Sequence, residues 1–203
     1  MTTVAALLKE HGALWSGATS AAFLDGVRDG TLPAAAFDRW LVQDHLFVET
    51  LLRSQGGLVA VAPPSDLGVL AGGVAALAEE LVWFESVAST RGLVVPGTPL
   101  PPTDAYNAFL RSMPSLPYGA AISALFAVER AYLDAWQGAR PGAPPYREFV
   151  DHWTVPAFAD YVAGLEAAAD RTLASASPDE VATASRAVAE VATHEAAFWA
   201  MAV

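Results

Sequence analysis

Apolar residues recur every three or four positions along most of this sequence, which is the spacing of one face of an α-helix. One such row consists of Leu67, Leu70, Val74, Leu77, Leu81, Phe84 and Val87. Alternating apolar and polar residues, which would mark strands, are almost absent, and the helix-favouring residues Ala and Leu are abundant. The pattern predicts an all-α protein with little or no strand.

Glycine and proline divide the helical pattern, because glycine adds backbone freedom and proline removes a hydrogen-bond donor. The sequence Asp29-Gly30-Thr31-Leu32-Pro33 predicts a turn, and Pro156 predicts a kink inside a long helix. The divisions predict eight helices, near residues 3–11, 19–28, 33–61, 67–91, 103–113, 116–136, 145–174 and 178–203. Short loops join them, so we expect one helical bundle, a single domain over residues 1–203.

The composition narrows the classes of partner and of chemistry. The chain has 203 residues, of which 54% are hydrophobic, enough for a large core. Its net charge is −11 and it has no cluster of Lys or Arg, so we expect neither nucleic acid nor a membrane surface as a partner. No leader is evident in Met1–Glu10 and no apolar run is long enough for a spanning helix, so we expect a cytoplasmic protein. The absence of cysteine removes disulfides, thiolate metal sites and thiol nucleophiles.

Three acidic residues interrupt the apolar rows of three different predicted helices: Asp44, Glu129 and Glu195. A carboxylate on a core-facing row loses hydration, so it must be paired, hydrogen-bonded or protonated. For any one of them, a buried ion pair or a helix N-terminus is an equally good explanation. Three such ion pairs would be demanding for a chain with only 11 basic residues. We therefore expect the three acids to meet in one polar pocket, together with Tyr106, Tyr132 and Trp153.

The histidines give no metal motif. His11, His45, His152 and His194 form no Glu-x-x-His pair, and His45 and His194 point about 100° away from the acids beside them. No glycine-rich phosphate loop and no nucleophile elbow is present. We expect neither a metal nor another cofactor.

Two stretches of the chain carry a family resemblance. Phe23 and the run from Arg28 to Phe37, followed by Trp40-Leu41-Val42-Gln43-Asp44-His45, resemble the entry to the third helix of the TenA/thiaminase II family. The run from Glu195 to Met201 resembles the family's C-terminal motif, and the segments between them follow in the same order. The resemblance implies a heme-oxygenase-like helical bundle. In that fold class His11 could in principle be a haem ligand, but a histidine at a helix C-terminus is the simpler reading.

The resemblance also implies roles for single residues. Asp44 would hydrogen-bond an aminopyrimidine, Glu195 would handle the leaving amine, and Tyr106 and Tyr132 would line the pocket. Phe47 and Trp153 stand where tyrosines are usual, and Phe198 belongs to the C-terminal motif, so we assign these three to substrate binding as well. The family's best-known branch has a Pro-Cys pair where this chain has Ala127-Val128. Glu129 follows, and the chain resembles a branch in which a glutamate serves in place of the cysteine.

The expected function is therefore hydrolysis of an aminomethyl- or formylaminomethyl-pyrimidine in thiamin salvage. Glu129 would act as base or nucleophile and Glu195 as acid, with their pKa values pushed apart by their surroundings. Two other readings stay open: a binding or regulatory protein without turnover, and a metal-dependent oxidase of the same fold. The resemblance further implies a homotetramer, for which Trp83, Phe84 and the loop 92–102 could supply apolar contact area.

Overall fold

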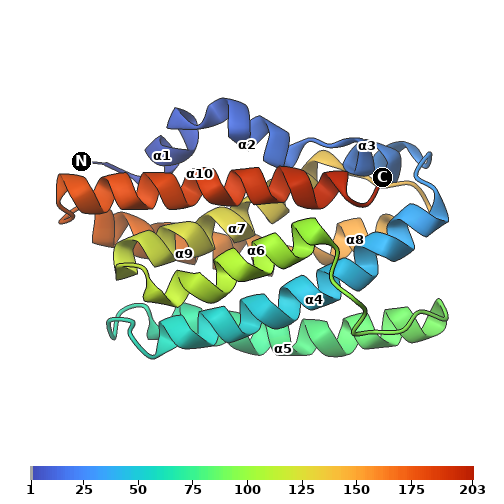
Figure 1. Cartoon of the computed structure of the whole chain (residues 1–203), viewed down its shortest axis with the longest axis horizontal. Coiled ribbons are helices and arrows are strands. Elements are labelled where there is room, and N and C mark those ends of the chain that lie inside the picture. Colours follow the sequence, from blue (N-terminus) through green and yellow to red (C-terminus); the bar gives the residue numbers. More distant parts are fainter. Residues whose placement is uncertain (1) are drawn as a thin grey trace.

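The computed structural model describes residues 2–203, and within them the chain consists of helices and the loops that join them, with no strand (Figure 1). The all-α prediction is confirmed. The elements are α1 (Val4–Glu10), α2 (Gly12–Thr19), α3 (Ala22–Asp29), α4 (Ala34–Val59), α5 (Leu67–Thr90), α6 (Pro101–Ser112), the 3-10 turn η1 (Met113–Ser115), α7 (Tyr118–Gly138), α8 (Arg147–His152), α9 (Pro156–Leu173) and α10 (Pro178–Ala200).

Residues 2–203 contain ten α-helices, where the sequence predicted eight. One difference is α2, which begins at Gly12 directly after α1; the glycine was read as the end of a helix, whereas it is the first residue of the next. The other lies at Pro156, where the chain breaks completely instead of kinking. The residue before a proline is pushed out of helical geometry, and Val155 is extended, with φ −68° and ψ 147°. The residues between α8 and α9, which include Trp153, are thereby free to turn into the bundle.

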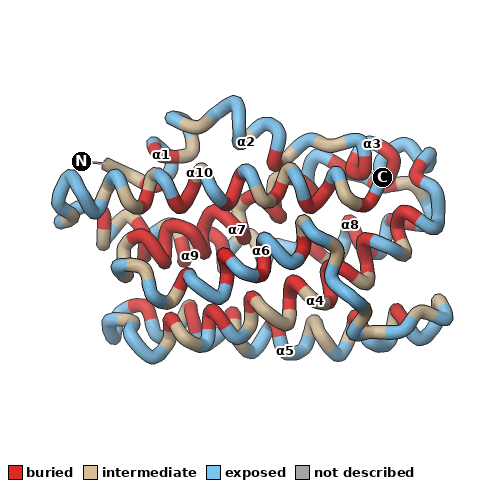
Figure 2. Tube along the Cα trace, in the orientation of Figure 1, coloured by how far each residue is buried: buried red, intermediate tan, exposed pale blue. Residues whose placement is uncertain are grey.

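Helix α7 forms the centre of the bundle, in contact with α10, α9, α2 and α4 (Figures 1 and 2). Nearly all of its residues are buried, and many are alanines whose small side chains allow neighbouring helices to approach from several sides. Glu129 is on this helix and is buried with it. A charge-bearing residue in the middle of the most enclosed helix is the first structural pointer to a site.

Helix α5 forms one side of the bundle, against α4 and α9. Among the described residues it is the one helix whose length and composition would allow it to cross a membrane. Of its most apolar 18-residue stretch, 22% is buried within the structure. The expectation that no run is long enough to span a membrane is therefore corrected for this helix, whose apolar sequence is interrupted by Glu79 and Glu80. Glu80 lies on the inner side of α5 and lines the cavity described below.

The prediction that Trp83 and Phe84 supply apolar surface for contact with another copy is wrong. Phe84 is fully buried, and Trp83 is half-buried and lines the interior cavity. Both rings pack against Trp153, at centroid distances of 5.4 and 6.0 Å, so the adjacent pair points inward. Val82, 66% exposed, is on the outer side of α5, and Val94 in the following loop is also exposed.

Candidate active site

A cavity of about 770 Å³ opens between α4, α5, α7 and α9, with residues from the end of α8 at one side. This volume falls within the roughly 300–1,000 Å³ of small-molecule sites. Its wall is mainly apolar and aromatic, and it contains Phe47, Leu51, Leu77, Glu79, Glu80, Trp83, Glu129, Tyr132, His152, Trp153, Phe158, Asp160 and Tyr161. No Lys or Arg is among the described residues that line it.

The eight site residues named from the sequence divide into two layers. Phe47, Glu129, Tyr132 and Trp153 line the cavity itself. Asp44, Tyr106, Glu195 and Phe198 are buried one layer further in, each in contact with a residue of the first group or with its neighbour. The structure therefore gathers all eight in one region, although only Glu129 of the three acids reaches the open space.

Asp44 is fully enclosed behind Tyr132. It comes from α4, and the Tyr132 hydroxyl donates a 2.6 Å hydrogen bond to its Oδ2. Its Oδ1 has no hydrogen-bond partner in the described part of the chain. Burial raises the pKa of Asp44 well above its usual value, and the negative charges of Glu80 and Glu195 raise it further, against the effect of the tyrosine hydrogen bond. Burial thus disfavours the charged form of this side chain, which lies one hydrogen bond behind Tyr132 of the cavity wall.

Glu195 of α10 is almost fully buried, and the Tyr106 hydroxyl donates a 2.7 Å hydrogen bond to its Oε1. Burial raises the pKa of Glu195 to about 8, although this hydrogen bond opposes the rise. Tyr106 does not line the open cavity, where the sequence analysis placed it. Its bond to Glu195 draws it toward α10, and Phe47 lies next to it with a ring-centroid distance of 4.9 Å. Phe198 packs on the same phenylalanine at 5.6 Å.

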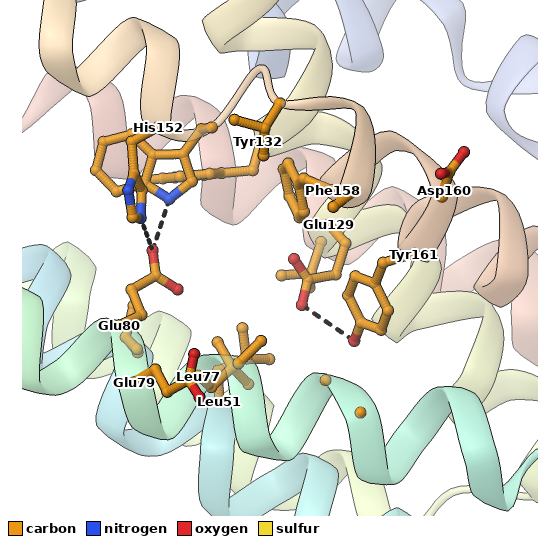
Figure 3. Close-up of a pocket in the computed structure, with 18 of the residues that line it drawn as sticks. Leu51, Leu77, Glu79, Glu80, Glu129, Tyr132, His152, Phe158, Asp160 and Tyr161 are labelled. Carbon is orange, nitrogen blue, oxygen red and sulfur yellow. Dashed lines mark hydrogen bonds and ion pairs between the residues drawn. The ribbon is translucent and has the colours of Figure 1, made fainter.

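Glu129 of α7 points into the cavity with only 6% of the residue exposed (Figure 3). The Tyr161 hydroxyl approaches its Oε1 at 3.5 Å, a long contact. Burial raises the pKa of Glu129 to about 8, and the charges of Glu80 and Glu195 add to the rise. No Lys or Arg of residues 2–203 forms an ion pair with Asp44, Glu129 or Glu195. The buried ion pair, which was the alternative explanation for each acid, is absent from this part of the chain.

Glu80, Tyr161 and Gln55 belong to the site but were not predicted. The Glu80 Oε1 accepts a 2.6 Å hydrogen bond from the Trp153 indole and lies 3.8 Å from His152 Nε2. The Tyr161 hydroxyl donates to Gln55 Oε1 at 3.1 Å. Gly73 of α5 makes this arrangement possible, since a Cβ there would overlap both Gln55 and the Tyr161 hydroxyl.

Of these residues, Glu80 had a signal in the sequence and Tyr161 had none. The inward row of α5 is Leu70, Gly73, Leu77, Phe84 and Ala88, and Glu80 continues its spacing between Leu77 and Phe84. The sequence pattern was read with Leu81 as the inward residue, which hid Glu80. Glu80 nevertheless interrupts the inward row of α5 in the same way as Asp44, Glu129 and Glu195 interrupt theirs. Tyr161 carried no such signal, because a tyrosine in an apolar row looks like an ordinary core residue.

The model of the TENA/THI-4/PQQC family matches residues 8–203, nearly the whole chain. This chain belongs to the TENA/THI-4/PQQC family. The family resemblance seen in the sequence is thereby confirmed.

The relatives of this TenA-family chain include plant and archaeal proteins. A soybean (Glycine max) protein described as a probable bifunctional TENA-E protein is 31% identical over 207 residues, covering 96% of this chain and 90% of its own. A TenA homologue from Pyrococcus furiosus has a TM-score of 0.94 and 30% identity over 98% of both chains. A putative TenA-like thiaminase from Sulfolobus solfataricus, 19% identical, shares the fold with a TM-score of 0.84 over 100% of this chain and 96% of its own.

The TenA-family site in this chain is rich in buried carboxyl groups. It contains four carboxyl groups with raised pKa values, each with a hydrogen-bond donor nearby, and the sequence supplies no thiol. The sequence analysis expected the pKa values of Glu129 and Glu195 to be pushed apart, but burial raises both to about 8. No group of three metal-binding side chains occurs within residues 2–203.

These raised pKa values predict that the protein is most stable at mildly acidic pH. In the unfolded chain the same carboxyl groups lose their protons near pH 4, so between about pH 4.5 and 7 the folded state binds more protons. The free energy of unfolding then falls as pH rises, by at most about 1.4 kcal/mol per pH unit for each such group. Thermal melts should give a lower Tm at pH 8 than at pH 5, with a weaker decline in Glu129→Gln. A Tm that rises over this interval would show that the acids are ionised in the folded protein.

Proposed function

We propose that this chain is an aminopyrimidine hydrolase of the thiaminase II type, which cleaves a C–N bond in the salvage of the thiamin pyrimidine. The observation that carries the proposal is Glu129. It is a buried carboxyl group with no cationic partner, it faces a ligand-sized cavity, and it lies in a chain without any thiol. A buried carboxyl group with a raised pKa and no cationic partner is typical of catalytic acids and bases.

The proposed reaction replaces an amine by water. Ionised Glu129 removes a proton from a water molecule, whose oxygen bonds to the exocyclic methylene carbon of the pyrimidine. The C–N bond breaks, and Glu195, whose side chain must first turn from its place behind the wall toward the cavity, donates its proton to the departing nitrogen. The products are a hydroxymethylpyrimidine and ammonia. Direct attack by the Glu129 carboxylate, followed by hydrolysis of the ester, would give the same products.

Asp44 is assigned to holding the ring. Burial favours its neutral form, and its unpartnered Oδ1 can bond to the amidine edge of the ring once the cavity wall in front of it opens toward the ring. Tyr132 fixes the orientation of Asp44 through the 2.6 Å hydrogen bond. Phe47 and Trp153 provide aromatic surface for the ring, and Phe198 supports Phe47 from behind.

The names of relatives support the reaction class. The Sulfolobus protein is described as a TenA-like thiaminase, and the soybean relative as TENA-E.

The test is to incubate the purified protein separately with aminomethylpyrimidine, formylaminomethylpyrimidine and thiamin, and to follow the products by mass spectrometry. We expect hydroxymethylpyrimidine from the first. With the formyl compound, Glu129-activated water would release formate and leave the aminomethylpyrimidine.

A binding or regulatory role is the second candidate, because a structural relative from a Silicibacter species, 20% identical, is described as a TenA family transcription regulator. That protein has a TM-score of 0.88 over 98% of this chain and 95% of its own. The net charge of −11 opposes direct contact with DNA. Tight binding of an aminopyrimidine without conversion of any of the three compounds would favour this role.

We further propose that the protein assembles, as a homotetramer. The exposed apolar residues Val82 and Val94, on α5 and the loop after it, are suited to contact a second copy. Sedimentation at micromolar concentration should give a species of about four times 21.2 kDa. Val82→Glu should shift the species toward smaller sizes, and a wild-type protein that sediments at 21.2 kDa would refute the assembly.

A further inference from the structure

Gln55 is a polar side chain buried completely among the helices around the cavity. It lies on α4, and none of its surface is exposed. Its Nε2 donates a 2.8 Å hydrogen bond to the backbone carbonyl of Leu70 on α5. A carbonyl oxygen only accepts, so the nitrogen end of the amide must face Leu70 and the oxygen end must face the other way. The fold therefore fixes the orientation of this amide, and its Oε1 can only accept.

The group that meets the Gln55 Oε1 is the hydroxyl of Tyr161 on α9. This hydroxyl donates to Gln55 at 3.1 Å, and its oxygen lies 3.5 Å from the Oε1 of Glu129 (Figure 3). A tyrosine hydroxyl has one hydrogen, which can point to only one of the two acceptors. Gln55 is the nearer acceptor and accepts at any pH, whereas a protonated Glu129 can itself donate to the Tyr161 oxygen. The hydrogen of Tyr161 therefore lies toward Gln55, and the lone pairs of its oxygen face Glu129.

Helix α5 leaves room for this arrangement at Gly73. A Cβ at this position would overlap both the amide nitrogen of Gln55 and the hydroxyl of Tyr161. Glycine weakens the interior of a helix, and Gly73 is a buried position in the middle of α5. The close approach of Gln55 and Tyr161 accounts for a glycine there.

We propose that Gln55 is a positioning residue, which holds the Tyr161 hydrogen away from Glu129 so that the Tyr161 oxygen pairs with the protonated form of that acid. This rests on the proposed function, in which Glu129 is the general base. A hydrogen bond donated by Tyr161 would stabilise the carboxylate of Glu129 and lower its pKa, against the effect of burial. With that hydrogen on Gln55, the effect of burial is not opposed, and Glu129 is a stronger base toward water.

The other titratable groups around Glu129 are the same whichever way the Tyr161 hydrogen points. The negative charges of Glu80 and Glu195 raise the pKa of Glu129. The titratable groups on the cavity wall and directly behind it are Asp44 of α4, Glu79 and Glu80 of α5, Tyr106 of α6, Tyr132 of α7, His152 of α8, Asp160 and Tyr161 of α9, and Glu195 of α10. A substitution of Gln55 removes none of them, so it changes the pKa of Glu129 through the Tyr161 hydrogen.

The test is a carbon-13 NMR titration of the full chain, labelled in its glutamate carboxyl groups, with the Glu129 signal identified by its loss in Glu129→Gln. Gln55→Met keeps the length of the side chain and removes the amide. The Tyr161 hydroxyl can then donate to Glu129, so we expect the pKa of Glu129 to fall by roughly 1–2 pH units, as for one hydrogen bond to a charged group. Gln137→Met, the same change at an exposed position of α7, should leave this pKa unchanged.

Tyr161→Phe separates positioning from packing, because it removes the hydroxyl and keeps the ring. In this background Gln55→Met should lower the pKa of Glu129 by less than about 0.3 pH units. A fall of the full size in this background, or no fall in Gln55→Met alone, would overturn the proposal. A rise of the pKa in Tyr161→Phe alone would also overturn it, because it would show that Tyr161 donates to Glu129 in the wild-type protein.

Hydrolysis of aminomethylpyrimidine gives a second readout. In Gln55→Met the acidic limb of kcat/KM against pH should move to lower pH by the same amount as the pKa measured by NMR. An acidic limb that stays in place in an active variant would contradict the positioning role. The NMR titration needs no turnover, so the expected fall in pKa in a protein that does not hydrolyse the aminopyrimidine would refute the proposed function alone.

Discussion

Glu129→Gln is expected to slow the hydrolysis of aminomethylpyrimidine by roughly 10²–10⁴-fold, the range typical of a lost general base. The amide keeps the shape of the side chain and a hydrogen-bonding oxygen for Tyr161, so the affinity for the pyrimidine, measured by calorimetry, should change little. The Tm should stay level or rise, because a neutral amide replaces a carboxyl group that burial makes costly to ionise. The exposed Glu190, changed to Gln in the same way, serves as the control and should keep full activity.

The contrary outcome for Glu129 is equally specific. If the residue served only the fold, Gln would lower the stability of the protein without a separate loss of catalysis. Activity would then decline only as far as folding does. Unchanged turnover in a well-folded variant would remove Glu129 from the mechanism and leave Glu195 as the remaining acid to examine.

Glu195→Gln is expected to have an effect of similar size that depends on the leaving group. An amine departs poorly without a proton, so the loss should reach roughly 10²–10⁴-fold for aminomethylpyrimidine. Thiamin has a positively charged ring nitrogen and releases a neutral thiazole, for which no proton is needed. We therefore expect a loss of less than about 10-fold with thiamin, measured as kcat in the same variant.

An equal loss for both substrates would contradict the assignment of Glu195 as the acid for the leaving group. Tyr106→Phe provides a companion variant, because it removes the 2.7 Å hydrogen bond to Glu195 but keeps the carboxyl group. Without that donor the pKa of Glu195 should rise further, since the bond now opposes the effect of burial. The variant should retain proton donation and extend it to higher pH.

The fold could be predicted from the sequence because the spacing of apolar residues and the positions of prolines determine, from nearby residues alone, where helices form and end. The long helices α4, α5, α7 and α10 follow from rows of apolar residues, and the glycine turn at Gly30, with φ 75°, lies where it was expected. The short helix α2 and the break before α9 were missed. In both places, whether a helix forms or ends depends on packing against neighbouring helices, and a local sequence pattern contains no information about that packing.

The site could be predicted in part, because a charge in an apolar row is visible in the sequence. This rule identified Asp44, Glu129 and Glu195, and it missed Glu80 only through the choice of Leu81 as the inward residue. The layering of the site could not be predicted. Whether an acid faces the cavity, as Glu129 does, or lies behind a tyrosine, as Asp44 does, depends on packing between helices distant in the sequence.

The central claim, that buried carboxyl groups make this TenA-family protein a hydrolase, is tested most directly by following aminomethylpyrimidine in water labelled with oxygen-18. We expect repeated turnover by the wild-type protein, with the heavy oxygen in the hydroxymethyl group of the product and one ammonia released for each molecule formed. A wild-type protein that binds the aminopyrimidine in calorimetry, yet forms neither labelled product nor ammonia, would contradict it.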